Sequence, residues 1–250
     1  MTRDETLLAK RFVDLSRQAQ QKDIVVFSEF LNLNELNIFR QEASELYSDF
    51  KFYGGYESSE RQMIAFLPDA LCYTWNFPIS CLKITPLNKK FAEKLNHRDV
   101  LGSLMNLGIE RSKLGDILLE ESTIYVFCHE NIAEYIIEQL TCIRHTAVQT
   151  EQTLPDAINF QFQKETLEGI ITSNRLDSVI ACICKISRSQ ANQWISSGRV
   201  FINHKEILQI TYQCHPQELI SVRSFGRFRF LDCIGETRKG RLKIQYERYL

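Results

Sequence analysis

Apolar positions near the N-terminus recur at the spacing of an amphipathic helix. The residues of this stripe are Leu7, Leu8, Phe12, Val13 and Leu15. A second helix is predicted over the run ELNIFRQEASEL, with Asn34 as its N-terminal cap. The stretch 50–67 then predicts an extended segment, a turn at Gly54 and Gly55, and a further extended or helical piece. We therefore predict a mainly helical N-terminal region over residues 1–75.

The pattern changes after residue 75, where short strand-like runs alternate with helical ones. Strands are predicted over 79–87, 115–120, 122–128 and 145–152. Helices are predicted over 97–108, which ends at Gly108, and over 131–140. The resulting order, β-α-β-β-α-β, is the split βαβ arrangement of ferredoxin-like and RRM-like domains. We expect such a domain over residues 76–152.

Two aromatic residues on the third predicted strand of this domain bear on its function. Tyr125 and Phe127 lie on one face of that strand, where functional RRM domains present aromatic side chains that stack on RNA bases. The Lys/Arg-Gly-Phe motif of such domains is missing from this sequence, and this part of the chain is acidic. We therefore interpret both residues as core, and the domain as a scaffold or a protein contact.

The most specific pattern of the chain is the run NRLDSVIACICKISRSQANQWISSGRVFIN, which follows a predicted linker over residues 153–172. The one strand-like piece of that linker is FQFQ (160–163). The run itself predicts a helix and a break. A second helix then opens at Ser187, with Gln190 placed as in a capping box. Gly198 ends this helix, and the strand RVFIN leads to Asn203-His204, a hairpin position that favours positive φ. The sequence predicts a helix-turn-helix followed by a hairpin.

Composition excludes several classes of function. The 250 residues are 44% hydrophobic and 24% charged, as in ordinary globular proteins. No apolar run approaches the ~20 residues that span a bilayer, and the charged N-terminus lacks the apolar core of a signal peptide. The eight cysteines include no C-x-x-C pair, and no histidines cluster at metal-ligand spacing. We expect a cytoplasmic protein with reduced, mostly buried thiols and with no cofactor, metal, membrane partner or small-molecule substrate.

The net charge of −1 hides an asymmetry along the chain. Residues 1–171 contain 17 Lys and Arg against 25 Asp and Glu, whereas residues 172–250 contain 13 against 6. A basic module joined to an acidic body indicates a C-terminal end that binds a polyanion.

Cations lie at the corners of the predicted C-terminal motif. Arg188 is in the first turn of its second helix, where unsatisfied N–H groups favour an anion, and we expect Arg175 to lie close to it. Arginine offers forked donors to phosphates, and Phe225 and Phe228 stand among the later arginines, where aromatic rings can stack on unpaired bases. The candidate RNA-binding residues are Arg175, Lys185, Arg188, Arg199, Lys205, Arg223 and Arg227.

The pattern R-L-D…S-R…A…I…G-R-V…I-N resembles an S4 RNA-binding domain, which we expect over residues 173–250. The whole chain resembles the YlmH family, bacterial proteins with an RRM-like N-terminal region and a C-terminal S4 domain. HRDVLGSLMNLGIERSKLGDIL is similar to that family's internal signature, and ISVRSFGRF is similar to its C-terminal arginine segment. His204, the run CHPQELISV and Ser224 depart from the S4 pattern, all of them in turns.

This resemblance implies an α+β protein that binds structured RNA, mainly ribosomal RNA on the large ribosomal subunit, and also tRNA. By analogy with related S4 proteins, it implies a role in ribosome-associated quality control, in which peptidyl-tRNA is held while stalled nascent chains are extended and cleared. We expect no enzymatic activity. Two alternatives stay open: an RNA-modifying enzyme with its catalytic domain in residues 1–150 and an S4 targeting domain, and a protein-interaction adaptor with secondary RNA binding.

Three short motifs resemble parts of enzymes. HRD (97–99) resembles the catalytic loop of kinases, but the chain has no Gly-rich phosphate loop, and we predict a helix start capped by Asn96. KISRS (185–189) resembles a loop of class I aminoacyl-tRNA synthetases, and NRLD (174–177) resembles the catalytic motif of pseudouridine synthases. The sequence lacks the catalytic domain that either motif requires. We predict that Asp177 is structural, paired with an arginine or a backbone N–H group.

Overall fold

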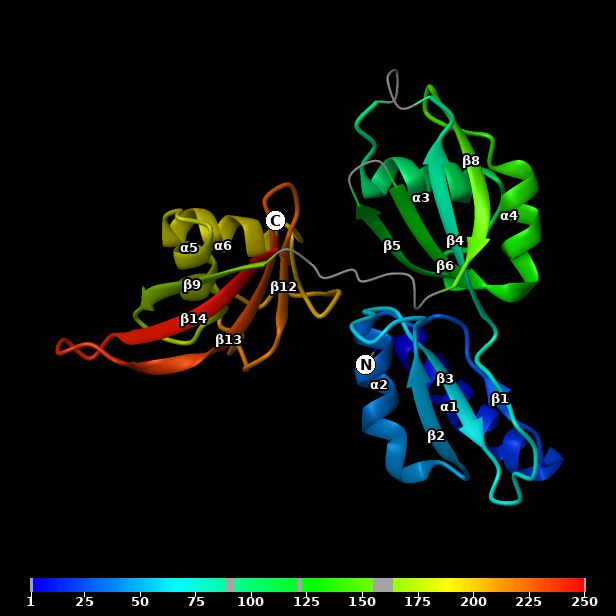
Figure 1. Ribbon diagram of the computed structural model, residues 1–250. Helices are drawn as coiled ribbons and strands as arrows, with labels where there is room; N and C mark the ends of the chain where they lie inside the picture. Colours follow the sequence, from blue (N-terminus) through cyan, green and yellow to red (C-terminus); the bar gives the residue numbers. More distant parts are fainter. Residues whose placement is uncertain (1, 89–92, 121–122, 155–163, 250) are drawn as a thin grey trace. The chain divides into compact units, whose positions relative to one another are not determined.

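The chain divides into two compact units. The computed structural model describes residues 2–88, 93–120, 123–154 and 164–249. An N-terminal unit spans Met1–Phe160 and a C-terminal unit spans Gln161–Leu250 (Figure 1). Within the described residues, no helix is long and apolar enough to cross a membrane.

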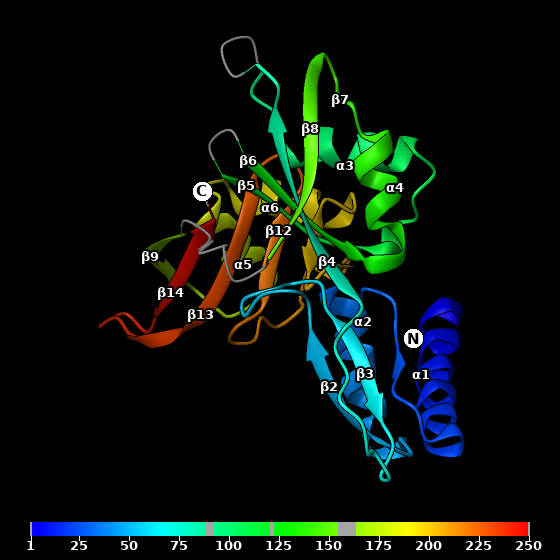
Figure 2. The same ribbon diagram turned by 45° about the vertical axis from the view of Figure 1, so that its right-hand side comes forward.

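The first part of the N-terminal unit combines two helices with a three-stranded antiparallel sheet. Its elements are α1 (Arg3–Lys22), β1 (Val26–Phe27), α2 (Leu33–Glu42), a 3-10 turn (Ala43–Glu45), β2 (Asp49–Tyr53) and β3 (Met63–Leu67), with the strand order β1-β3-β2. Both helices pack on one face of this sheet (Figure 2), around a core that includes Phe12, Phe39 and Phe66. The predicted helices are present, and a three-stranded sheet accompanies them. The sequence pattern missed β1 because the strand has two residues and shows no period.

The cap of α2 differs from the prediction. Asn32, not Asn34, caps this helix, since its side chain accepts hydrogen bonds from the backbone N–H groups of Asn34 and Glu35. The Glu35 carboxylate in turn accepts the N–H of Asn32 at 2.6 Å. This reciprocal arrangement is a capping box, and it satisfies the backbone N–H groups of Asn32, Asn34 and Glu35. A cap at Asn34 would not satisfy these groups.

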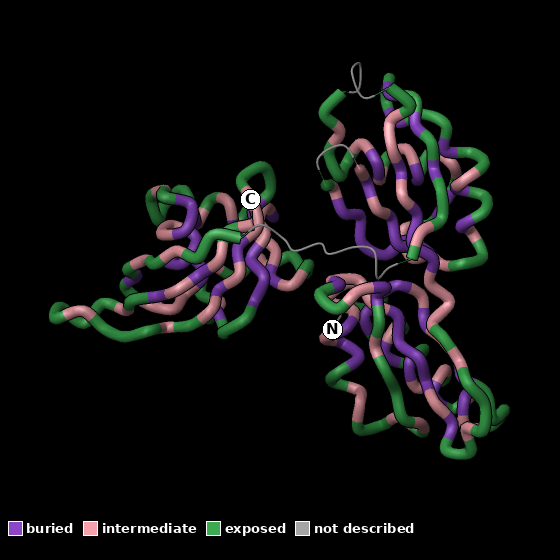
Figure 3. The backbone as a smooth tube through the Cα atoms, in the orientation of Figure 1, coloured by how far each residue is buried: buried purple, intermediate pink, exposed green. Residues whose placement is uncertain are grey.

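The second part of the N-terminal unit has the predicted β-α-β-β-α-β order, with one additional two-residue strand before the last strand. Its elements are β4 (Ile79–Pro86), α3 (His97–Asn106), a 3-10 turn (Arg111–Lys113), β5 (Leu114–Glu120), β6 (Thr123–His129), a 3-10 turn (Glu130–Ile132), α4 (Ala133–Gln139), β7 (Cys142–Ile143) and β8 (Thr146–Thr153). The strands form an antiparallel sheet in the order β5-β6-β4-β8-β7. Buried positions run along the central strands and the inner faces of α3 and α4 (Figure 3). The RRM-like arrangement is confirmed.

The HRD motif is the start of α3. The Asn96 side chain accepts the N–H groups of Arg98 and Asp99, and the Asp99 carboxylate accepts the N–H of Asn96 at 3.0 Å. Val100 and Leu104 bury the inner face of the helix. The predicted helix start is therefore confirmed.

The C-terminal unit packs two short helices on one face of a six-stranded antiparallel sheet. Its elements are β9 (Lys164–Ile171), α5 (Leu176–Ile183), α6 (Arg188–Ser196), β10 (Val200–Ile202), β11 (Lys205–Glu206), β12 (Leu219–Val222), β13 (Gly226–Glu236) and β14 (Leu242–Tyr249). The strand order is β11-β10-β12-β13-β14-β9. The core between helices and sheet includes Val179, Ile195 and Phe228.

Strand β9 occupies part of the stretch that the sequence pattern assigns to a linker. Residues Lys164–Ile171 pair along their whole length with β14. Gly169 lies so close to α5 that a Cβ there would sit 2.4 Å from the Cys182 sulfur. A glycine and several exposed charges in this run hide its strand character from a search for alternation. The piece FQFQ lies outside the described residues.

Candidate RNA interface

A buried carboxylate joins two candidate arginines at the helix-helix corner of the C-terminal unit. Asp177, in the first turn of α5, is 2% exposed. It accepts the Arg175 Nε–H at 3.1 Å and the Arg188 Nη2–H at 2.6 Å. The arginine side chains are themselves 37% and 48% exposed. Asp177 therefore has the predicted structural pairing, and it fixes two guanidinium groups side by side at the surface.

Local geometry places these arginines at the beginning of a helix. Ser187 caps α6 by accepting the Gln190 N–H at 3.2 Å, so Arg188 is the first helical residue. The first N–H groups of a helix carry a partial positive charge. Lys185 occupies the tight turn between the helices with φ of +54°, and it is exposed. The cations and the helix start thus present positive charge at one corner.

A second pair of arginines meets at the ends of β10 and β12. The Arg223 N–H donates to the Arg199 carbonyl at 2.9 Å, and the Arg199 Nη2–H donates to the Arg223 carbonyl at 3.2 Å. The Arg199 guanidinium lies 4.9 Å from the Trp194 ring centre, and that of Arg223 lies 4.8 Å from the Phe201 ring centre. Each cation is therefore held on an aromatic face, which limits the entropy lost on binding.

Arg227 belongs to a third group on β13 and its neighbours. Its guanidinium lies 5.1 Å from the Tyr249 ring centre, and the Arg229 Nη2–H donates to the Tyr249 hydroxyl at 3.0 Å. Lys164 of β9 also lies 5.1 Å from this ring. Sequence reasoning missed Tyr249 and Lys164 because they are distant in the chain and meet Arg227 only through the pairing of β9, β13 and β14.

Lys205 is placed on the edge strand β11, directly after the predicted left-handed turn. Asn203 and His204 have φ of +48° and +68°, as predicted for this hairpin. Asn203 stabilises the turn because its side-chain oxygen accepts the Leu219 N–H at 3.0 Å. His204, the second residue of the turn, adopts the left-handed backbone conformation that glycine adopts readily.

The Gly-Asp pair of the predicted family signature, Gly115 and Asp116, links two parts of the N-terminal unit. Asp116 is buried and accepts the Tyr56 hydroxyl at 2.8 Å and the N–H groups of Glu60 and Arg61 at 2.7 and 3.1 Å. Burial raises the pKa of Asp116, and these hydrogen bonds oppose the rise. The carboxylate therefore joins the loop before β3 to strand β5.

Two arginines strengthen this link by donating hydrogen bonds to backbone carbonyls. The Arg61 guanidinium donates to the carbonyls of Phe30 and Leu114, both at 2.8 Å, and Arg111 donates to those of Leu114 and Gly115. Burial, and then the neighbouring Arg61, lower the pKa of Arg111 to about 10. These groups lock the helix-sheet part of the unit to the RRM-like part.

Residues next to this link also cover the face of the sheet on which an RRM stacks bases. Phe127 is fully buried and stacks on Tyr56 with ring centres 5.1 Å apart. A Cβ at Gly55 or Gly115 would lie within 2.9 Å of Phe127 atoms, so the backbones approach this ring closely. The interpretation of Phe127 as core is confirmed, whereas Tyr125 is only partly buried.

Comparison with protein families bears on both units. A model described as "Putative RNA-binding domain in YlmH" matches residues 74–156, and a model of the S4 domain matches residues 175–220. The chain carries a YlmH-type RNA-binding domain and an S4 domain. The S4 match contains Arg175, Lys185, Arg188, Arg199 and Lys205, while Arg223 and Arg227 follow it directly.

Individual relatives agree with this assignment. The chain is 26% identical over 250 residues to "Ribosome-associated protein quality control protein P2" of Bacillus subtilis strain 168, covering 98% of this chain and 96% of that protein. Among solved structures, "Cell division protein ylmH from Streptococcus pneumoniae" is 22% identical, with a TM-score of 0.51 over 61% of this chain and 93% of that one. The structural match shows a shared fold.

The assignment describes binding domains, and neither family description names a reaction. Among the described residues, no group of three or more His, Cys, Asp and Glu side chains could hold a metal ion. All eight cysteines are free, and four of them, Cys81, Cys128, Cys184 and Cys214, are buried.

Proposed function

We propose that this protein binds ribosomal RNA of the large ribosomal subunit through its C-terminal unit. We further propose that it acts in quality control of stalled nascent chains, where it holds tRNA in place. The observation that carries the RNA contact is the pair of arginines fixed by Asp177 at the start of α6. The name of the Bacillus relative supports the quality-control role.

The geometry of the pair suits a phosphate better than a base. Asp177 occupies one edge of each guanidinium, and the side chains remain 37% and 48% exposed for a second partner. Arginine presents several N–H donors in a fixed plane, so a group bound at one edge still donates from another. The partial charge at the start of α6 adds to this attraction. Two positioned cations can therefore contact adjacent phosphates of an RNA strand.

The other arginine groups extend this contact. Arg199 and Arg223 lie on aromatic rings at one end of β10 and β12, and Arg227 lies on Tyr249. With Lys185 and Lys205 they provide cations on α5–α6, on the hairpin and on β13. A structured RNA that presents phosphates from more than one strand matches this distribution.

Co-sedimentation with large ribosomal subunits tests the RNA contact. We expect the double variant Arg175→Ala/Arg188→Ala to lose at least tenfold in affinity. The slope of log affinity against log salt should also fall by about 1 for each phosphate that the variant leaves without a cation. The matched control is Arg238→Ala/Lys239→Ala, which removes two exposed cations from the turn between β13 and β14. Unchanged co-sedimentation of the first variant would reject the proposal.

The same assay tests the tRNA contact. Large subunits loaded with peptidyl-tRNA should retain the protein more strongly than vacant subunits, because a held tRNA adds contacts to those of ribosomal RNA. Equal retention by loaded and vacant subunits would reject tRNA holding and leave the ribosomal RNA contact standing.

A further inference from the structure

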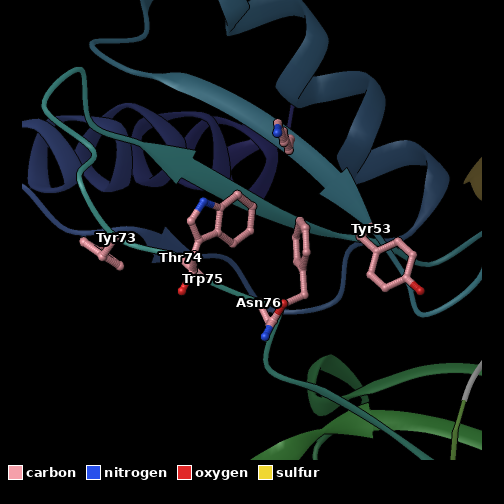
Figure 4. Close-up of a pocket in the computed structure, with 7 residues that line it drawn as sticks. Tyr53, Tyr73, Thr74, Trp75 and Asn76 are labelled. Carbon is pink, nitrogen blue, oxygen red and sulfur yellow. The ribbon is translucent and has the colours of Figure 1, made fainter.

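The helix-sheet part of the N-terminal unit carries an open groove lined mostly by aromatic side chains. Its volume is about 510 Å³. The lining residues, which we call the aromatic groove, are Lys51, Tyr53, Tyr73, Thr74, Trp75, Asn76 and Phe77. Figure 4 shows that they come from β2 and from the segment that leads from β3 to β4. The motifs that predict the C-terminal unit and the RRM-like domain do not include these residues.

Strand alternation explains why aromatic residues collect there. Phe50 and Phe52 of β2 contact Phe39 of α2 in the core, so Lys51 and Tyr53 face the other side of the sheet. The segment 73–77 lies across that side. The Val25 N–H donates to the Tyr73 hydroxyl at 2.7 Å and fixes the beginning of the segment.

The rings support one another and leave faces open. The ring centre of Phe77 lies 5.3 Å from that of Trp75 and 5.5 Å from that of Tyr53, and both Trp75 and Phe77 also pack on Phe27 of β1. Tyr53 and Tyr73 nevertheless keep 36% and 45% of their surface exposed. The groove is thus a preformed set of flat apolar faces with access to solvent.

The polar groups of the groove indicate what it binds. Among its seven lining residues the single charged one is Lys51, whose ammonium lies 5.9 Å from the Trp75 ring centre. Thr74 and Asn76 also line the groove and add a hydroxyl and an amide that can form hydrogen bonds. A flat ring that carries polar edges and an attached negative charge complements this set, and an unpaired nucleotide has these properties.

Two further observations favour RNA over other partners. The matched model described as an RNA-binding domain begins at residue 74, so it includes the groove segment 74–77. In addition, Phe127, at the position where an RRM stacks a base, is buried under Tyr56. The groove therefore supplies the exposed aromatic faces on which RNA bases can stack in the N-terminal unit. A proline-rich peptide also fits aromatic grooves, but it carries no charge that would use Lys51.

We propose that the aromatic groove binds an unpaired nucleotide of RNA, with the base stacked on its aromatic rings, Trp75 among them, and its phosphate beside Lys51. This inference rests on the proposed function only in taking RNA as the partner. The site lies in the N-terminal unit, so it is separable by mutation from the arginines of the C-terminal unit.

Tryptophan fluorescence of the full chain tests the site. The chain has two tryptophans, so the variant Trp194→Phe leaves Trp75 as the sole reporter. We expect single-stranded hexauridylate to quench its emission saturably and a blunt RNA duplex to leave it unchanged. Adding Lys51→Glu should raise the dissociation constant at least fivefold. The matched control is Lys10→Glu, the same charge change at an exposed position of α1 on the opposite face of the sheet.

The outcomes separate the alternatives. Quenching by a decaproline peptide but not by hexauridylate would overturn the nucleotide site in favour of a peptide groove, and no response to either ligand would overturn it altogether. If Trp194→Phe impairs folding, fluorine NMR of the unsubstituted chain labelled with fluorotryptophan reports on Trp75 directly.

Quenching should persist in the Arg175→Ala/Arg188→Ala background, even though that variant no longer sediments with large subunits. If the double variant still sediments normally while Trp75 is quenched, the proposed RNA contact through Arg175 and Arg188 is rejected. The nucleotide site in the aromatic groove is then still supported.

Discussion

Asp177 determines how two arginines of the C-terminal unit meet their ligand. Its carboxylate is buried, and both of its partners lie at the surface. A buried carboxylate with two arginine partners is more than neutralised, so the group as a whole stays positive. Replacing the carboxylate with an amide would leave Arg175 and Arg188 one neutral acceptor oxygen in place of two charged ones.

We expect Asp177→Asn to weaken binding to the large subunit, although the change makes the protein more positive. Simple charge counting predicts the opposite result, so the direction of the effect distinguishes alignment from attraction. The variant should also lower the free energy of unfolding by about 1.5–3 kcal/mol, the range for a hydrogen bond to a charged group. Co-sedimentation and urea unfolding measure the two effects.

Asp232→Asn provides the matched control for that experiment. Asp232 is exposed, and its carboxylate accepts the neighbouring Cys233 N–H at 2.7 Å. The substitution makes the same change in net charge without disturbing an arginine. Stronger subunit binding by Asp177→Asn would show that alignment by this carboxylate contributes nothing.

Thiol reactivity should divide the cysteines by burial. Burial raises the pKa of Cys81, Cys128 and Cys184 to about 12, so at pH 8 these three have almost no reactive thiolate. The exposed Cys72 and Cys142 should react with a maleimide within minutes. Mass spectrometry of the native and the urea-unfolded protein provides the measurement. Rapid native labelling of Cys128 would contradict the packing of the RRM-like core.

Sequence reasoning at this scale succeeded where partners are close in the chain. Arg175 and Asp177 are two residues apart, and the helix-turn-helix pattern brings Arg188 to them, so their proximity was predictable. The contact of Arg227 with Tyr249 was not predictable, because it depends on the register of β13 against β14, which contains two irregularities.

At the scale of elements, the stretch from α3 to β5 explains the HRD…GD pattern without catalysis. Its first residues cap a helix and its last ones, Gly115 and Asp116, seat strand β5 against the helix-sheet part of the same unit. Gly102, in the middle of α3, has open space around the position of a Cβ. Gly102 and Gly115 therefore have different physical roles.

We expect Gly115→Ala to lower the free energy of unfolding by about 1–3 kcal/mol, the usual cost of overpacking. The new methyl group would lie 2.8 Å from Phe30 and 2.9 Å from Phe127. Gly102→Ala is the matched control and should raise stability by about 0.5–1 kcal/mol, because alanine favours a helix. Thermal unfolding of both variants tests the pair, and equal effects of the two substitutions would refute the packing argument.

The elements themselves were predictable to different degrees. The β-α-β-β-α-β order followed from clear changes of period, and the caps of α3 and α6 followed from Asn96 and Ser187. The two-residue strand β1 and the strand β9 did not, because one is too short to show a period and the other carries exposed charges. Tertiary pairing, rather than local preference, stabilises both.

At the scale of the whole molecule, the two units differ in charge and each has its own core. The N-terminal unit contains 16 Lys and Arg against 23 Asp and Glu, and the C-terminal unit contains 14 against 8. The core of the C-terminal unit consists entirely of residues between Leu167 and Tyr246. A self-contained core indicates that this unit can fold alone.

We expect a fragment of residues 164–250 to unfold cooperatively on heating and to sediment with large subunits in a salt-sensitive manner. A fragment of residues 1–154 serves as its comparison and should sediment far less, because it is acidic. Circular dichroism and co-sedimentation provide the measurements. Stronger sedimentation of the acidic fragment than of residues 164–250 would favour the adaptor alternative, in which the N-terminal unit makes the main contact.

Strands β9 and β14 are neighbours at one edge of the C-terminal sheet, and Lys164 pairs in register with Tyr249 (Figure 1). The polypeptide thus enters and leaves this unit at a single point. Inserting it into a surface loop of an unrelated host would require no long connection, and joining its ends would close a ring with little distortion. The unit could therefore be transferred to another protein as a whole, with its candidate RNA-binding arginines in place.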